Sequence, residues 1–311
     1  MFSNIKQRLD DLVPPHENYR YFSPDRVGQL EPSEVEFSVP NACWMADAAL
    51  LAYADEEQAR QWSSQPFAQG QFQDVRYFVG KTTQAYVAVH AEFIVTAFRG
   101  TRLVKPQQQA SAESQWELFL GSLQDMVIDA QLILRPEGAA QHVHHGFQQA
   151  LNQIWEPLHA HWQTLRSRHP DRPFWMTGHS LGAALATLAA SRNPPHTLYT
   201  YGSPRTGDVG FATAFSGLPT SAFRVINDRD PITQVPLAVM GYQHVGRLVR
   251  IVGSNPPQLE FRDSEPPPLT SLFDIRNFDW SALRSADPRS WFDHAPKNYA
   301  DQLAAIQSRP T

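Results

Sequence analysis

Short runs of apolar residues in the first third of the chain predict strands. They are DVRYFV at 74–79, AYVAV at 85–89 and FIVTAF at 93–98, and polar breaks separate them. Val, Ile, Phe and Tyr in runs of this length are typical of β-strands. We expect these three segments to be adjacent strands that open a sheet.

Further along the chain, the apolar pattern alternates between the strand period and the helix period. The expected order is a strand (PFWMT, 173–177), a helix (181–190), a strand (196–201), a helix around 207–215 and a strand (221–226). Strands that alternate with helices form βαβ units, whose strands run parallel. The predicted fold class is therefore α/β, with a mainly parallel central sheet flanked by helices.

Two more helices are predicted from composition and spacing. Residues 41–53 are rich in Ala and Leu, which suits a buried helix. From Phe147 to Leu165, apolar residues recur mostly at steps of three and four, the pattern of an amphipathic helix. Because a proline inside a helix removes a hydrogen bond, Pro157 predicts a kink or a break there.

Polar segments mark the predicted boundaries. Residues 1–40 carry five prolines and no periodic pattern, so we expect an irregular arm lying on one domain that comprises residues 41–311. Residues 102–115 predict a polar loop, followed by a short amphipathic helix from Trp116. The prolines of 256–269 predict an irregular excursion.

Composition narrows the class of protein. A chain of 311 residues, 42% of them hydrophobic, can bury one large core. The net charge of -5 gives no basic stripe of the kind that nucleic acids require, so no nucleic-acid partner is expected. No run reaches the roughly 18 apolar residues of a transmembrane helix. With no signal-like apolar run near the start and Cys43 as the single cysteine, we expect a cytoplasmic location.

The sequence Gly178-His179-Ser180-Leu181-Gly182 carries the strongest chemical signal. It lies between a predicted strand and an Ala-rich helix, so the chain must turn sharply at Ser180. Such a turn exposes the serine as a nucleophile, and the N-terminus of the following helix favours a developing oxyanion. Small residues can also simply end a strand, but the elements on both sides favour the nucleophile.

A serine nucleophile needs a base and an acid, in the chain order serine, acid, histidine for an α/β-hydrolase. His244 and His294 are the histidines downstream of both Ser180 and the acidic turn that follows the strand at 221–226. The acid is Asp228 or Asp230. The residue pattern alone does not choose within either pair.

Seven segments in order now resemble a known family, the class 3 lipases, typified by the fungal triacylglycerol lipases. The resemblance runs from about Asn41 to Tyr299. Beyond GHSLGAALA, the segments are FRGT (98–101), DMVIDAQL (125–132), VHHGF (143–147), YTYGSPRTGD (199–208), FRVINDRDPITQVP (223–236), GYQHVG (241–246) and DHAPKNY (293–299).

The resemblance implies a choice within both pairs. It places the acid at Asp230 and the base at His294, leaving Asp228 as a turn residue and His244 as a structural histidine. It also implies an oxyanion hole formed by the backbone N–H groups of Leu181 and Thr101. Fixed donors of this kind are typically the largest catalytic contribution.

The family's lid would correspond here to residues 102–124. It contains a cluster of apolar residues that either contacts the lipid substrate or belongs to the ordinary core: Trp116, Leu118, Phe119 and Leu120. The lid is longer than in the fungal members, and Thr101 stands where they have serine. The resemblance therefore implies the fold and the triad, and it does not imply one substrate class.

The implied function is hydrolysis of carboxylic esters of lipids, most simply acylglycerols, through an acyl-enzyme and without a cofactor or metal. The partner would be a lipid ester or a lipid–water interface. A phospholipase, a galactolipase and a feruloyl-type esterase share the same residues. A non-catalytic lipid-binding protein is the alternative from another class, and the intact triad and oxyanion segment argue against it.

Five other residues invite functional interpretations that we set aside. His142 and His145 lie near His144, but no acidic residue or cysteine stands at the usual ligand spacing, so no metal site is predicted. We expect His144 to be a buried hydrogen-bonding residue behind the site, Asp129 to be a buried structural acid and Cys43 to be packing.

Overall fold

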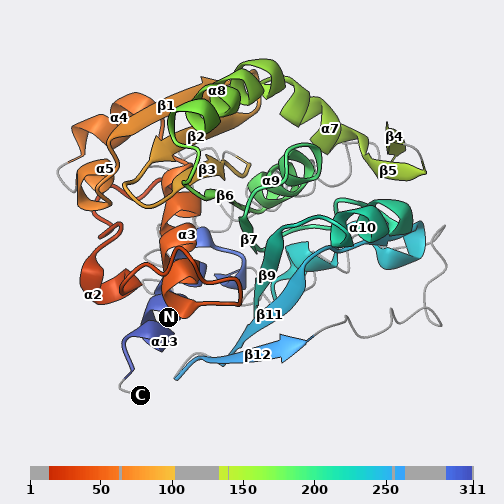
Figure 1. Ribbon diagram of the computed structural model, residues 1–311. Coiled ribbons are helices and arrows are strands. Elements are labelled where there is room, and N and C mark those ends of the chain that lie inside the picture. The colour runs from red at the N-terminus through yellow and green to blue at the C-terminus, as the bar shows by residue number, and fades with distance from the viewer. Residues whose placement is uncertain are drawn as a thin grey trace, which may run out of the picture.

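The computed structural model describes residues 14–62, 65–101, 133–138, 140–253, 256–262 and 292–309. Its centre is an eight-stranded sheet with the strand order β1-β2-β3-β6-β7-β9-β11-β12 (Figure 1). The strands are β1 (Asp74–Val79), β2 (Gln84–Val89), β3 (Ile94–Phe98), β6 (Phe174–His179), β7 (Thr197–Tyr201), β9 (Ser221–Asn227), β11 (Arg247–Val252) and β12 (Gln258–Arg262).

Five adjacent strands, from β3 to β11, run parallel, and the pairs at the two edges of the sheet are antiparallel. This confirms the predicted α/β class with a mainly parallel sheet. Phe98 pairs with Gly178, and His179 pairs with Tyr201. The carboxyl ends of β3, β6, β7 and β9 therefore meet at one edge, where open α/β sheets place their ligands.

Helices cover both faces of the sheet, as the prediction required. On one face lie α3 (Val39–Leu51) and α13 (Pro296–Gln307), together with the short α2 (Pro24–Val27), α4 (Glu56–Gln61) and α5 (Pro66–Gln69). On the other lie α7 (His145–Asn152), α8 (Trp155–Arg168), α9 (Leu181–Arg192) and α10 (Val209–Ser216) (Figure 1).

The core has two layers because side chains alternate along each strand. In β2, Tyr86 and Ala88 pack on the α3 side, and Val87 and Val89 pack on the α8 side. All six residues of β2 are buried, which explains why its sequence is a continuous apolar run.

The sequence did not indicate a second, four-stranded sheet of order β10-β8-β5-β4. Its strands are β4 (Leu134–Gly138), β5 (Gln141–His144), β8 (Gly207–Asp208) and β10 (Tyr242–Gln243). Strands of two to five residues are too short to show a period, and pairings such as Val143 with Gly207 join distant parts of the chain. Two 3₁₀-helices, η1 (Pro231–Gln234) and η2 (Ala238–Met240), precede β10.

Of two predictions from proline, the break in the helix near Pro157 is confirmed, and the irregular excursion was wrong in part. The helix expected from Phe147 to Leu165 is interrupted before Trp155, and Pro157 lies in the first turn of α8. N–H groups in the first turn of a helix have no acceptor within that helix, so proline is tolerated there. The excursion expected over 256–269 instead contains β12, which pairs with β11 as far as Arg262. Residues 263–269 lie outside the described residues.

The described part of the N-terminal segment is anchored to the domain by a buried polar group. Asp47 of α3 accepts hydrogen bonds from the Tyr19 hydroxyl at 2.8 Å and the Phe22 amide at 2.7 Å. Arg26 pairs with Asp301 of α13 at 2.7 Å. The division of the chain at residue 40 stays a prediction.

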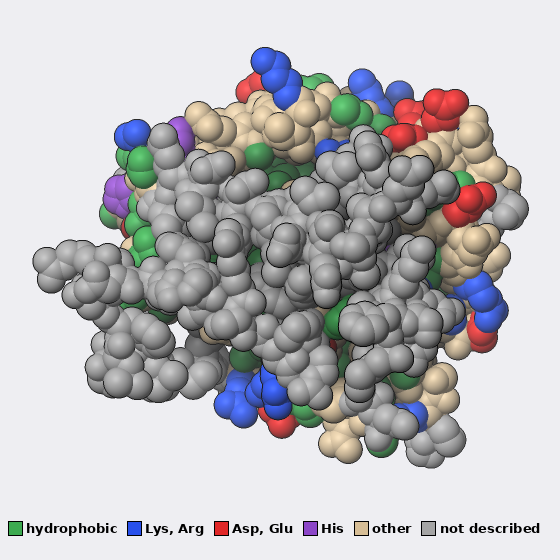
Figure 2. Space-filling model, turned by 180° about the vertical axis from the view of Figure 1, so that it is seen from behind, with side chains coloured by type: hydrophobic (Ala, Val, Ile, Leu, Met, Phe, Trp, Pro, Cys, Tyr) green, Lys and Arg blue, Asp and Glu red, His purple; other side chains and the backbone are tan. Residues whose placement is uncertain are grey.

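Charged side chains of the described residues are dispersed on the face that Figure 2 shows. Lys, Arg, Asp and Glu are scattered around its rim, with no continuous basic patch among the described residues of that face. None of the helices in the described ranges is long and apolar enough to span a membrane. Cys43 is buried in α3, and this burial raises the pKa of its thiol, in keeping with a packing residue.

Candidate active site

Ser180 lies at a sharp turn between β6 and α9. Its backbone has φ 59° and ψ -127°, a region that residues other than glycine rarely adopt. Strain of this kind persists only where the surrounding structure imposes it, and it concentrates at functional sites. The turn has the form of a nucleophile elbow, as the motif predicts.

The two glycines of the motif allow the elements around Ser180 to approach closely. A Cβ atom on Gly178 would overlap the carbonyl oxygen of Gly182, and one on Gly182 would overlap the carbonyl oxygen of Phe98. Any larger residue would therefore force α9 away from β6 or from the end of β3. The spacing of the glycines around Ser180 is a packing requirement of the turn.

His294 connects Ser180 to Asp230. Its Nε2 lies 3.0 Å from Ser180 Oγ, and its Nδ1 lies 3.0 and 2.9 Å from the two carboxylate oxygens of Asp230. A carboxylate only accepts hydrogen bonds, so Nδ1 carries the proton and Nε2 can accept the serine proton. All three side chains are buried. This is the geometry of a serine activated by an oriented general base.

Asp230 is itself held by its neighbours. It follows β9 and caps η1, where its Oδ1 accepts the Ile232 amide at 2.9 Å. The Tyr299 hydroxyl of α13 donates to Oδ2 at 2.6 Å. With these donors and His294, the carboxylate is fixed in one orientation.

The alternative acid and base lie elsewhere. Asp228 occupies a turn with φ 34° and accepts a hydrogen bond from Arg250 at 3.4 Å. His244 donates from Nε2 to the Thr233 carbonyl at 2.8 Å. The structure brings Asp230 and His294 together with Ser180, and it brings neither Asp228 nor His244 into that hydrogen-bonded chain.

The predicted oxyanion donors come from the start of α9 and from the segment that follows β3. Leu181 is the first residue of α9, and the first N–H groups of a helix have no acceptor within it and lie at its positive end. Thr101 follows the end of β3, which pairs with β6 at Phe98 and Gly178. Both residues are partly exposed. Their role in binding an oxyanion stays a prediction.

Several predicted residues lie outside the described residues. They are the lid range 102–124 with Trp116, Leu118, Phe119 and Leu120, and also Asp129. The predicted lid and its contact with substrate therefore stay predictions.

The sequence interpretation missed three residues that pack around the triad. Tyr299 was visible as the last residue of DHAPKNY, but no role was assigned to it. His179 occupies the variable position of the serine motif, and its ring lies 4.6 Å from that of His294. Tyr53, two residues past the end of α3, hydrogen-bonds to His179 at 2.8 Å. No sequence signal pointed to Tyr53.

The histidines near residue 144 have structural contacts. His144 is buried and accepts the Phe147 amide at the start of α7, and burial lowers its pKa to about 4. Contrary to the spacing argument, an acid does lie near this cluster, because Asp208 contacts His142 at 2.9 Å. Even so, no three potential metal ligands converge within the described ranges.

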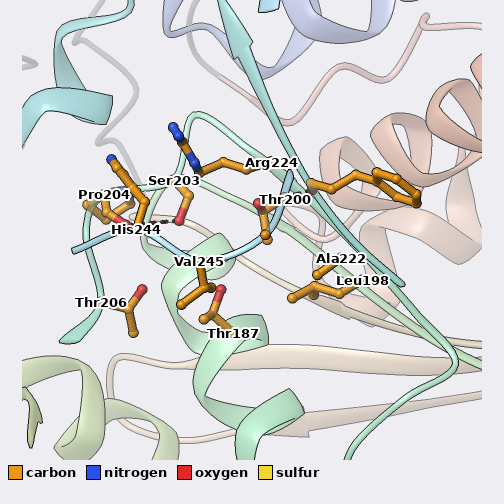
Figure 3. Close-up of a pocket in the computed structure, with 12 residues that line it drawn as sticks. Thr187, Leu198, Thr200, Ser203, Pro204, Thr206, Ala222, Arg224, His244 and Val245 are labelled. Carbon is orange, nitrogen blue, oxygen red and sulfur yellow. Dashed lines mark hydrogen bonds between the residues drawn. The ribbon is translucent and has the colours of Figure 1, made fainter. Parts of the chain in front are cut away.

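A small cavity beside α9 is separate from the triad (Figure 3). Its volume of about 10 Å³ suits one water molecule. Its polar lining includes Thr187, Thr200, Ser203 and His244, whereas Ser180, Asp230 and His294 do not line it. The cavity is too small to hold an ester substrate.

The parallel sheet, the elbow at Ser180 and the hydrogen-bonded set of Ser180, His294 and Asp230 define the α/β-hydrolase class. Comparison with known proteins narrows this class. The family model described as lipase (class 3) matches residues 95–240. This match covers slightly less than half of the chain, and it shows similarity to the class 3 lipase family.

Among curated relatives, the secreted mono- and diacylglycerol lipase 1 of Fusarium solani is 38% identical over 106 residues, 33% of this chain and 32% of that protein. The lipase of Rhizomucor miehei is 30% identical over 141 residues, 42% of this chain and 38% of the relative. The matched stretches thus span only about a third of these relatives' length.

Solved structures support the fold. The triacylglyceride lipase of Rhizomucor miehei has a TM-score of 0.59 at 22% identity, covering 71% of this chain and 83% of that one. The mono- and diacylglycerol lipase of Aspergillus oryzae has a TM-score of 0.61 at 18% identity, covering 86% and 99% of the two chains. These similarities show that the fold is the one seen in fungal lipases.

The expected cytoplasmic location was wrong. Relatives from Fusarium solani, Penicillium cyclopium and Malassezia globosa are named as secreted lipases. The expectation relied on the apolar pattern near the start of the sequence and on the single cysteine Cys43. A single cysteine excludes an internal disulfide but does not bear on export.

Proposed function

We propose that this protein is a carboxylic ester hydrolase that acts on acylglycerols through an acyl-enzyme. One observation carries the proposal: Ser180, at a strained elbow, is hydrogen-bonded to His294, which is hydrogen-bonded to Asp230. A hydroxyl in this setting has a base within reach of its proton, and that base has an acid to orient it.

In the proposed reaction, Ser180 Oγ attacks the ester carbonyl and its proton passes to His294 Nε2. The tetrahedral intermediate then collapses, the C–O bond to the alcohol breaks, and His294 returns the proton to the leaving alcohol. Water attacks the acyl-enzyme in the same way and releases the fatty acid. Asp230 stays ionised and stabilises the imidazolium in both halves.

The negative charge that develops on the carbonyl oxygen of the tetrahedral intermediate needs hydrogen-bond donors near Ser180. We assign this role to the backbone N–H groups of Leu181, which follows Ser180 in the chain, and of Thr101, which lies just past the carboxyl end of β3. Removing one such donor in a serine hydrolase typically lowers kcat by roughly 100- to 1000-fold. In this proposal the Thr101 hydroxyl is a further donor to the oxyanion.

The names of relatives support acylglycerols as substrates and an extracellular site of action, because several are called secreted mono- and diacylglycerol lipases. Phospholipid hydrolysis is the second candidate. A chloroplastic phospholipase A(1) of Arabidopsis thaliana, DAD1, is 34% identical over 99 residues, 30% of this chain and 22% of that protein.

The test compares purified wild-type protein with Ser180→Ala on monoolein, diolein, triolein and phosphatidylcholine vesicles, with fatty-acid release as the readout. We expect release from acylglycerols by the wild type and none above background by the variant. Faster release from phosphatidylcholine would favour the second candidate. Equal release by wild type and variant would contradict the proposed function.

A further inference from the structure

We propose that Tyr53 and His179 are a positioning pair that fixes the main chain of His294 against the elbow and the oxyanion segment. The inference rests on the proposed ester hydrolysis. It assigns both residues a role in the rate of that reaction, although neither reaches the reacting atoms.

The hydrogen bonds of His179 have a defined direction. Its Nε2 lies 2.7 Å from the carbonyl oxygen of His294, and its Nδ1 lies 2.8 Å from the Tyr53 hydroxyl. A carbonyl only accepts, so Nε2 carries the hydrogen and Nδ1 of the neutral ring is an acceptor. Tyr53 therefore donates to His179, and His179 donates to the main chain of His294.

Burial keeps this chain of donors intact. His179 is fully enclosed, and desolvation together with the neighbouring His294 holds the pKa of His179 well below its usual value. Burial likewise raises the pKa of the Tyr53 hydroxyl. Near neutral pH His179 is therefore uncharged and Tyr53 is protonated, as the direction of the two bonds requires.

The pair joins three parts of the site. His179 is the last residue of β6 and precedes Ser180 in the chain. A Cβ atom on Gly100 would overlap the Tyr53 hydroxyl, so that hydroxyl lies directly against the segment that leads to Thr101. The pair thus contacts the nucleophile strand, the oxyanion segment and the base.

The loop that carries His294 is held from two sides. On one side, the Asn227 side chain donates to the Asp293 carbonyl at 3.1 Å. On the other side, His179 holds the next carbonyl, that of His294. Loss of the second contact would let the His294 backbone shift relative to Ser180, and a shift of about 1 Å can lower a rate roughly 100-fold.

The test uses three variants in the full chain: Tyr53→Phe, His179→Ala and His179→Gln, which retains a donor. Tyr86→Phe is the matched control, because Tyr86 is also fully buried and its hydroxyl donates to a main-chain carbonyl, that of Ala48, at 3.0 Å. For each protein, kcat and KM on a dissolved p-nitrophenyl ester, the urea midpoint and the rate of fluorophosphonate labelling are measured.

We expect kcat to fall about tenfold in Tyr53→Phe and about 100-fold in His179→Ala, with partial recovery in His179→Gln. KM should change less than twofold, because the loss concerns the transition state. The labelling rate should fall in parallel with kcat. Tyr86→Phe should lose stability but keep wild-type kcat.

If Tyr53→Phe and both His179 variants retain kcat at the level of the Tyr86→Phe control, the pair is ordinary packing and the inference is wrong. A wild-type protein that neither hydrolyses esters nor takes the label would instead overturn the proposed function, and the role of the pair with it. The wild-type arm therefore distinguishes the two failures.

Discussion

The Tyr299 hydroxyl donates a 2.6 Å hydrogen bond to Oδ2 of Asp230, the same oxygen that lies 2.9 Å from His294 Nδ1. Tyr299 of α13 thus orients Asp230, and His294, which lies just before α13, contacts the same carboxylate. Because Tyr299 OH also accepts the Asn227 amide at 3.0 Å, it links β9 to α13.

Replacing Tyr299 with Phe is therefore expected to lower activity without abolishing it. A hydrogen bond to a charged group contributes about 1.5–3 kcal/mol, and its loss should reduce kcat by roughly tenfold or more. Steady-state kinetics on a soluble ester, with the urea midpoint measured alongside, checks this. Unchanged kcat would mean that Asp230 is held well enough by Ile232 and His294 alone.

Gly202 should tolerate no side chain. Its φ is 56°, and a Cβ atom there would lie 2.7 Å from Asp230 Oδ2 and 3.0 Å from His294 Nδ1. Gly202→Ala is therefore expected to displace the acid and base and to lower kcat by roughly 100-fold. Gly241→Ala, at another positive-φ glycine with open space around it, controls for backbone strain alone. Equal activity losses in both variants would contradict the expectation.

Substitutions of the two candidate acids, and of the two candidate bases, should differ in their effect on kcat. Asp230→Asn is expected to reduce kcat far more than Asp228→Asn, and His294→Ala far more than His244→Ala, because one member of each pair lies in the hydrogen-bonded chain with Ser180. Turnover of a soluble ester by the four folded variants tests this. A reversed order in either pair would refute the assignment.

His144 should make the fold sensitive to acid. Its pKa falls from 6.5 to about 4 on folding, so the unfolded chain binds the extra proton between these values. This contribution to stability is therefore complete above pH 6.5 and lost as the pH falls towards 4, by up to about 3 kcal/mol. Urea unfolding is measured for the wild type and for His144→Asn, which keeps a capping side chain. The difference in free energy of unfolding between the wild type and the variant should shrink as the pH falls. A constant difference across that range would contradict the pKa shift.

The sequence predicted the parts of the structure that depend on local pattern. The central strands are long and apolar enough to be recognised, and the turn at Ser180 is specified by its own neighbours. The choice of Asp230 over Asp228 and of His294 over His244 came from family resemblance, because hydrogen bonds across 64 and 114 residues leave no local trace.

The remaining features depend on contacts between distant residues. The small sheet rests on pairings such as Val143 with Gly207, and Tyr53 meets His179 across 126 residues. Pro157 correctly indicated an interruption of the helix. The exact place of the interruption was not predictable, because α8 restarts at Trp155 and leaves Pro157 in its first turn, where proline is tolerated. Such features follow from tertiary packing, which a single sequence does not display.

The central claim is that Ser180 is a nucleophile activated by His294, and covalent labelling tests it most directly. A fluorophosphonate probe, followed by peptide mapping by mass spectrometry, is applied to the wild type, Ser180→Ala and His294→Ala. The account predicts one adduct per chain on Ser180, no adduct in Ser180→Ala and labelling slowed by roughly 10⁴-fold in His294→Ala. An adduct on another residue, or equally fast labelling in all three proteins, would contradict it.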